Sequence, residues 1–359
     1  MRAPPSTTPL ALCLGLGVGA PAAHAEGPIW VQAQTMFYAD NTEFFDAFRT
    51  GETTFGIHGR AFLSARPSEK VELRLGLFGN QRFGSDKAFE SARPVFALVI
   101  GGPRRALVLG TLETGRRADG PGPDRTTPHG LLPPIQVETL TFTRPYEAGL
   151  QSRVASDRVR NDLWIDWQTL IASGRREVFD TGSAGRVRVA GPFSLGVQLH
   201  EVHHGGQLTD VGSVSDSFAW GAGLVLEPKL PSLDHVSAEV FGLRSDHHPV
   251  RSRPETKKRG HGVFVRLAAE KRGFRLHGIL WRGVAYLKEE GDPLYRSQLE
   301  DGTPFEPTRR YEELGLTKLF PVMPGVAFEA SARLNWVQGK REYSYRVLAT
   351  TDLGWAVRR

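Results

Sequence analysis

The chain has 359 residues, with 45 lysines and arginines against 39 aspartates and glutamates, and its formal net charge is +6. This excess is mild for the length, so we expect a solvated surface and no nucleic-acid partner. Beyond the N-terminus no apolar run is long enough for a membrane-spanning helix, which excludes a helical membrane protein. A β-barrel membrane protein is not excluded, because the apolar residues of its strands alternate with polar ones.

The N-terminal residues 1–25 are typical of a cleaved secretion signal. An apolar stretch at residues 10–20 precedes an Ala-x-Ala cleavage site at residues 23–25. Cys13 lies in this stretch, but the leucine before it is not the small residue that a lipoprotein signal requires. We therefore expect residues 26–359 to form the mature protein, without a disulfide because the chain has only one cysteine.

Period-two alternation of apolar and polar residues dominates the rest of the chain and predicts β-strands. In the clearest segment, 326–337, Phe328 and Leu334 face one way and Glu329 and Arg333 the other. In chain order we predict strands at 29–39, 53–65, 70–82, 89–101, 105–115, 147–156, 159–171, 177–190, 193–205, 214–227, 235–246, 259–271, 273–288, 309–321, 325–338 and 341–357.

These sixteen strands predict an all-β fold, an antiparallel up-and-down transmembrane barrel. With this count the short or Pro/Gly-bearing connections all fall on the periplasmic side and the long ones on the outer side. The stretch from Gln136 to Arg144 is open to two interpretations. We place it in a long third outer loop, and the alternative is a further pair of strands, which gives eighteen.

A membrane barrel is favoured over a soluble sandwich because many segments reach about ten residues, the length with which a tilted strand crosses a bilayer. Trp and Tyr near the strand ends match an aromatic girdle; they are Trp30, Tyr38, Trp167, Trp336 and Trp355. The long last strand resembles the assembly signal of outer-membrane barrels, although two arginines follow its aromatic residues. We expect the protein to be located in the outer membrane of a Gram-negative bacterium.

The face opposite the apolar one should line the lumen, and it carries charges of both signs. The basic residues are Arg60, Arg74, Arg186, Arg188, Arg266, Arg275, Arg333 and Arg346. The acidic residues are Glu72, Asp166, Glu239, Glu270, Glu329 and Asp352. Such rings set ion selectivity in pores and favour a wide channel with a slight anion preference. The alternatives are that these charges pair with one another, and that the third outer loop folds inward and narrows the lumen.

Few residues suit catalysis. Histidines occur at predicted outer-loop borders (His203, His204, His247 and His248) and at predicted lumen positions (His58, His200 and His277). His235-Val236-Ser237 has the His-x-Ser spacing of barrel lipases and deacylases, but our topology places it at a periplasmic strand end, whereas those enzymes act at the outer leaflet. Adjacent strand residues point to opposite faces, so a His pair does not readily hold one metal ion. We expect no catalytic residue, cofactor or metal.

Several short blocks resemble a known family. They are 43–46 (EFFD), 49–53 (RTGET), 129–132 (HGLL), 144–151 (RPYEAGLQ) and 164–168 (WIDWQ). Together they resemble the outer-membrane barrels of Wzx/Wzy-type polysaccharide export pathways in myxobacteria, the Wzp-like barrels. That family has eighteen strands, unlike the sixteen counted here. The resemblance implies a partner, a short periplasmic polysaccharide-export protein, and no catalytic residues.

We therefore expect a conduit through which a secreted or capsular polysaccharide crosses the outer membrane, with membrane lipid around the barrel. The lumen residues named above would line its path. The alternatives are a general porin and, less favoured, an outer-membrane enzyme that modifies lipid or glycan.

Overall fold

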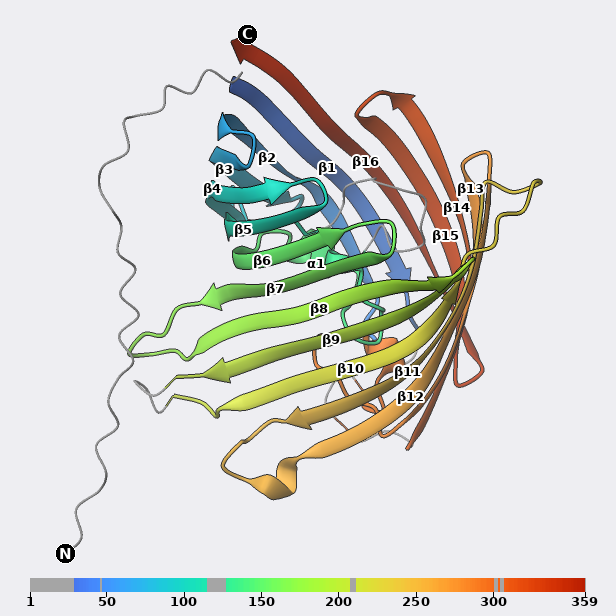
Figure 1. The fold of residues 1–359 in the computed structure, drawn as a ribbon. Helices are drawn as coiled ribbons and strands as arrows, with labels where there is room; N and C mark the ends of the chain where they lie inside the picture. The colour runs from blue at the N-terminus through green and yellow to red at the C-terminus, as the bar shows by residue number, and fades with distance from the viewer. Residues whose placement is uncertain are drawn as a thin grey trace, which may run out of the picture.

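The computed structural model describes residues 29–45, 47–114, 127–206, 211–299, 303 and 307–358. In this part of the chain sixteen antiparallel strands pair in sequence order, and β1 (Ile29–Glu43) closes the ring on β16 (Lys340–Arg358) (Figure 1). The other strands are β2 (Glu52–Ser68), β3 (Val71–Arg82), β4 (Ser91–Gly102), β5 (Arg105–Thr111), β6 (Ala148–Ala155), β7 (Val159–Thr169), β8 (Glu177–Ala190), β9 (Phe193–Gly205), β10 (Ser215–Leu226), β11 (His235–His248), β12 (Lys258–Lys271), β13 (Phe274–Val284), β14 (Thr308–Met323) and β15 (Val326–Val337).

The predicted sixteen-stranded up-and-down barrel is confirmed. Among the described residues, every helix is too short or too polar to span a bilayer. The expected signal, residues 1–25, and Cys13 within it lie outside the described residues.

Alternation sorts the side chains into two faces, as the sequence predicts. On β15, Leu334 is 43% exposed on the outside, whereas Arg333 beside it lies inside and pairs with Glu138 (2.9 Å). Barrels of this kind keep their termini and short turns in the periplasm and their long loops outside. The chain turns tightly at Pro324 and Gly325, between β14 and β15, which places that end in the periplasm.

The segment between β5 and β6 folds into the lumen. It contains the short helices η1 (Pro128–Gly130) and α1 (Leu140–Thr143), and α1 lies inside the ring in Figure 1. Its apolar side chains Leu131, Leu132, Ile135 and Phe142 are completely or almost completely buried. The alternative of eighteen strands is therefore wrong, because residues 136–144 belong to this inward segment.

A second outer connection, between β13 and β14, packs against the first. Its Tyr286, Leu294 and Tyr295 are buried, and Val137 donates its amide hydrogen to the carbonyl of Glu290 (2.8 Å). We call the described parts of the two segments, residues 127–147 and 285–299, the plug. On its periplasmic side lies a chamber of about 1050 Å³, whose lining extends from Thr111 and Tyr146 to Pro324 and Gly325.

Candidate functional site

The predicted lumen residues lie on the inner face, and most of their charges are paired. Arg74 contacts Glu72 (2.7 Å) and Glu113, and Arg266 contacts Glu239 (2.7 Å). The remaining pairs and contacts of this set are Arg186 with Glu227 and Glu239, Arg275 with Glu270, Arg333 with Glu138 and Glu313, Arg346 with Asp40 and Glu138, and Asp166 with the amide of Ala148. Arg60, Glu329 and Asp352 line the chamber, and Arg188 lies on β8 at its periplasmic end.

The expected wide channel is wrong for two reasons. The plug fills the outer part of the lumen, and the charges of the two signs largely neutralise each other. Arginine and carboxylate side chains that bond one another in this way stiffen the interior and hold the plug, as Arg333 and Arg346 do by sharing Glu138.

Two inner histidines pair with carboxylates but are sealed from solvent. His200 on β9 contacts Asp180 (2.9 Å) and is 0% exposed, and His277 on β13 contacts Glu313 (2.6 Å). Neither lines the chamber. A general base must reach the proton it removes, so both positions suit packing better than catalysis.

His129, in η1 of the plug, is bound at both ring nitrogens. Nε2 contacts Glu147 (2.7 Å) and Nδ1 contacts Asp162 (2.8 Å), while the ring stacks on Trp164 with centroids 3.8 Å apart. Burial alone lowers the pKa of His129, but the two carboxylates outweigh it and raise the pKa to about 10. The ring is therefore a cation that ties the plug to β7 through Asp162 and Trp164 and binds Glu147 just before β6, and it has no lone pair for catalysis.

His235 and Ser237 share the inner face of β11, as their spacing predicts, but they lie at its periplasmic end. Nε2 of His235 and Oγ of Ser237 are both buried, and neither has a hydrogen-bond partner among the described residues. They therefore form no dyad, and they lie at the wrong end of the barrel for an enzyme of the outer leaflet.

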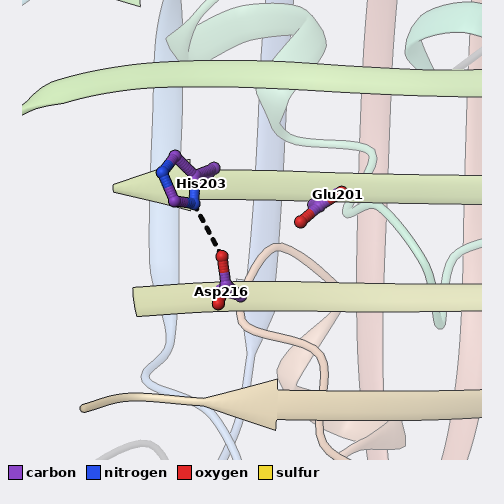
Figure 2. Close-up of side chains that lie close together, drawn as sticks. All are labelled: Glu201, His203 and Asp216. Atoms are coloured by element: carbon purple, nitrogen blue, oxygen red, sulfur yellow. Dashed lines mark hydrogen bonds and ion pairs between the residues drawn. The ribbon is translucent and has the colours of Figure 1, made fainter. Parts of the chain in front are cut away.

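One histidine has both a carboxylate partner and an outward position. His203, near the outer end of β9, faces Asp216 at the start of β10, and Nδ1 of His203 lies 2.6 Å from Oδ1 of Asp216 (Figure 2). Glu201 lies two residues before His203 on the same face of β9. The side chains of His203 and Asp216 are 15% and 16% exposed.

The alternation of β9 explains why this cluster faces outward. Gln198, His200 and Val202 are buried inside, whereas Leu195 and Val197 are about half exposed to the surrounding membrane. Glu201 and His203 follow Leu195 and Val197 at the same two-residue spacing, so they also face outward. The antiparallel register sets Asp216 directly opposite His203, so a hydrogen bond between neighbouring strands forms on the outer surface.

Aromatic and basic groups surround the cluster. The ring of Phe179 lies 4.9 Å from that of His203 and 5.7 Å from that of Trp167, which is 46% exposed. Aromatic rings of this kind mark the level where hydrocarbon meets lipid headgroups. On the other side, Nε of Arg251 lies 3.3 Å from Oδ2 of Asp216. The cluster thus lies where the acyl chains of an outer-leaflet lipid join its headgroup.

The geometry allows two kinds of chemistry, which exclude each other. If Nδ1 of His203 carries the proton and donates a hydrogen bond to Asp216, then Nε2 carries a lone pair and can act as a general base. Glu201, His203 and Asp216 also offer three ligand atoms within 4.8 Å of one another, enough for a divalent cation. A cation on Nδ1 would leave the proton on Nε2 and remove the base. The short 2.6 Å contact and the arginine on Asp216 favour the first arrangement.

Sequence reasoning named His203 but missed its partners. Asp216 lies beyond an outer loop from His203, and only the exact register of β9 against β10 pairs the two residues. The Glu-x-His spacing at 201 and 203 was available as a signal, because residues two apart share a face of a strand.

Structural comparison confirms the barrel. The loop L8 deletion mutant of OmpT, an outer membrane protein of Vibrio cholerae, is 8% identical with a TM-score of 0.55, over 91% of this chain and 99% of that one. OccK8 (OprE) of Pseudomonas aeruginosa is 9% identical with a TM-score of 0.51, over 91% and 98%. These likenesses show the fold and, with it, the outer-membrane location. No curated protein matches the chain.

Residues 22–358 match a family model described as lipid A 3'-O-deacylase-type. This match overturns the resemblance to Wzp-like export barrels, and with it the polysaccharide conduit and the periplasmic export partner that the resemblance implied. The expectation that the chain is not an enzyme is wrong too, because this family is one of hydrolases. Since the match covers nearly the whole chain, the protein belongs to the lipid A 3'-O-deacylase-type family.

Proposed function

We propose that this protein hydrolyses an ester-linked acyl chain of lipid A in the outer leaflet of the outer membrane, with His203 as general base and Asp216 as the residue that orients it. The observation that carries the proposal is the 2.6 Å contact between Nδ1 of His203 and Asp216 on the outward face at the outer rim. The family match supports the substrate class.

In this mechanism a water molecule attacks the ester carbonyl carbon while Nε2 of His203 takes its proton. Asp216 holds the ring in the tautomer that leaves Nε2 unprotonated, and its charge stabilises the imidazolium that forms. The tetrahedral intermediate then collapses, and the sugar oxygen leaves with the proton from His203. The products are a fatty acid and a free sugar hydroxyl, and the histidine returns to its neutral form.

Basic residues near the cluster suit a phosphorylated headgroup. Arg251 is 59% exposed beside Asp216, and Arg259, at the start of β12, is 76% exposed. Lys257, in the outer connection between β11 and β12, and Lys258, the first residue of β12, extend this group. Exposed arginines bind phosphate through paired hydrogen bonds, so the loop suits the phosphates of lipid A above the membrane surface.

The test measures fatty acid release from lipopolysaccharide in vesicles by mass spectrometry. His203→Ala and Asp216→Asn should each lower the rate by about 10²–10⁴-fold, as expected for loss of a general base or its correct tautomer. His204→Ala is the matched control, because this neighbour points to the opposite face of β9. Activity should survive EDTA. Normal release by His203→Ala would refute the dyad, and loss of release in EDTA would instead favour the cation arrangement.

A further inference from the structure

β5 and β6 are the shortest strands that the structure describes, so the barrel wall extends least far toward its outer side there. β4 pairs with β3 from Ser91 onward, but its pairing with β5 begins only at Ala97, opposite Gly110. β5 ends at Thr111, and from there the chain enters the lumen. Residues 91–96 of β4 therefore border a gap in the sheet, which we call the β4 notch. These six residues of strand span about 20 Å.

Within the part of the chain that the structure describes, side-chain contacts and no paired strand cover this edge. A bare strand edge in the bilayer is costly, since its backbone groups have no water to bond. The amide of Phe96 donates to Oγ1 of Thr111 (3.1 Å), and the hydroxyl of Tyr146 donates to the carbonyl of Pro94 (2.8 Å). Proline is tolerated in strands mainly at edges, because it has no N–H. Two side-chain hydrogen bonds thus cover this edge, and rotation of Tyr146 alone would break the one at Pro94.

Tyr146 lies between the β4 notch and the chamber, because it bonds Pro94 at the notch and lines the chamber. Its ring lies 5.4 Å from that of Phe78 and it lines the chamber together with Thr111. On the outer surface beside the notch, Phe96 is 58% and Leu77 is 72% exposed. Apolar surface therefore lies on both sides of one tyrosine.

The chamber is lined by acidic as well as basic residues, and it suits an amphipathic guest whose negative charge can reach an unpaired basic residue. At about 1050 Å³ it is at the upper end of the range for ligand pockets, and Met36, Phe241 and Leu348 give it apolar walls. Three of its arginines pair with carboxylates: Arg144 with Asp180, Arg153 with Glu113 and Arg186 with Glu227. Arg160 also lines the chamber, and it forms no ion pair with any residue that the structure describes.

We propose that Tyr146 is a lateral gate through which a long-chain fatty acid passes from the outer leaflet, by way of the β4 notch, into the chamber, where its carboxylate pairs with Arg160. This inference rests on the proposed function, because hydrolysis of lipid A releases such an acid beside the barrel. β9, which carries His203, is three strands from β6 along the same wall. The lining of the chamber reaches the periplasmic turn, so the gate leads the product away from the outer leaflet.

The gate is tested with cis-parinaric acid, a fatty acid that fluoresces in apolar sites, added to the purified full chain in phosphatidylcholine vesicles. Tyr146→Phe removes the bond to Pro94 and should speed binding and release by about two- to tenfold, the effect of one hydrogen bond, with unchanged affinity. Tyr146→Ala should speed both further. Tyr345→Ala is the matched control, because Tyr345 is 53% exposed on the lipid face of β16. Unchanged rates in both Tyr146 variants would refute the gate.

The charge partner is tested by competition between palmitic acid and hexadecanol, which differ only in the headgroup. Arg160→Gln should weaken displacement by the acid about tenfold or more, as expected for a lost charge-assisted hydrogen bond, and leave displacement by the alcohol unchanged. Equal effects on both would overturn the role of Arg160. His203→Ala should abolish hydrolysis and keep fatty acid binding. Failure of the gate and failure of the proposed function are thus distinguishable, since binding needs no catalysis.

Discussion

Gly205 gives the strictest test of the His203–Asp216 pair, because a substitution at Gly205 acts on the pair by steric contact and removes no group from it. A methyl group on Gly205 would lie 2.0 Å from Nε2 of His203, well inside any allowed contact, and every one of the three atoms nearest to that methyl group belongs to the imidazole. The ring is the mobile partner, so it must rotate. A rotation large enough to relieve the clash breaks the 2.6 Å contact with Asp216.

We therefore expect Gly205→Ala to lower fatty acid release by about 10²–10⁴-fold, as for removal of a general base, although it deletes no chemical group. Gly242→Ala is the control, because a methyl group there meets nothing within 4 Å. Release is measured from lipopolysaccharide vesicles, and heat-modifiable gel mobility reports the folded barrel. Full activity in a folded Gly205→Ala barrel would show that the orientation of His203 does not matter and would refute the mechanism.

Two further predictions concern the barrel itself. Leu334→Arg places a charge among lipid chains and should cost about 2–4 kcal/mol near the bilayer midplane, whereas Ser331→Arg on the inner-face series of β15 should be tolerated; equal loss of folded barrel on gels would contradict the assigned faces. The plug should loosen at high pH. The pKa of His129 is about 10, above the 6.5 of an unfolded histidine, so its contribution is complete below 6.5 and is lost as the pH rises through about 10. Conductance in planar bilayers should then rise, and a His129→Gln variant should show no such step; identical pH profiles would count against the clamp.

The fold could be predicted from the sequence because each strand depends on the pattern of its own residues. Alternation of apolar and polar residues predicts each strand, as at Val326–Val337, and the alternation of long and short loops predicts the number of strands. The inward course of residues 127–147 could be offered only as one of two alternatives, since Leu131 and Phe142 look the same in a loop that covers the rim and in one that fills the lumen. Only long-range packing decides between them.

The family resemblance failed for a related reason. The block at 164–168 contains Trp164, which stacks on His129, and Gln168, which bonds Arg144 of the plug (2.9 Å). The block at 49–53 contains Arg49, which pairs with Asp292 (3.2 Å). These blocks therefore describe how a barrel holds its plug, which says nothing about cargo. The site was missed because the contact between His203 and Asp216 depends on strand register, which short blocks do not contain.

The bonds between the two halves of the plug have a consequence for biogenesis. Asp292 donates its amide hydrogen to the carbonyl of Pro133 (2.9 Å), so a segment that follows β5 is completed by one that follows β13. When the first six strands have reached the periplasm, Leu131, Leu132 and Ile135 still lack this cover. The interior of the lumen is therefore completed only when the segment after β13 has joined the segment after β5.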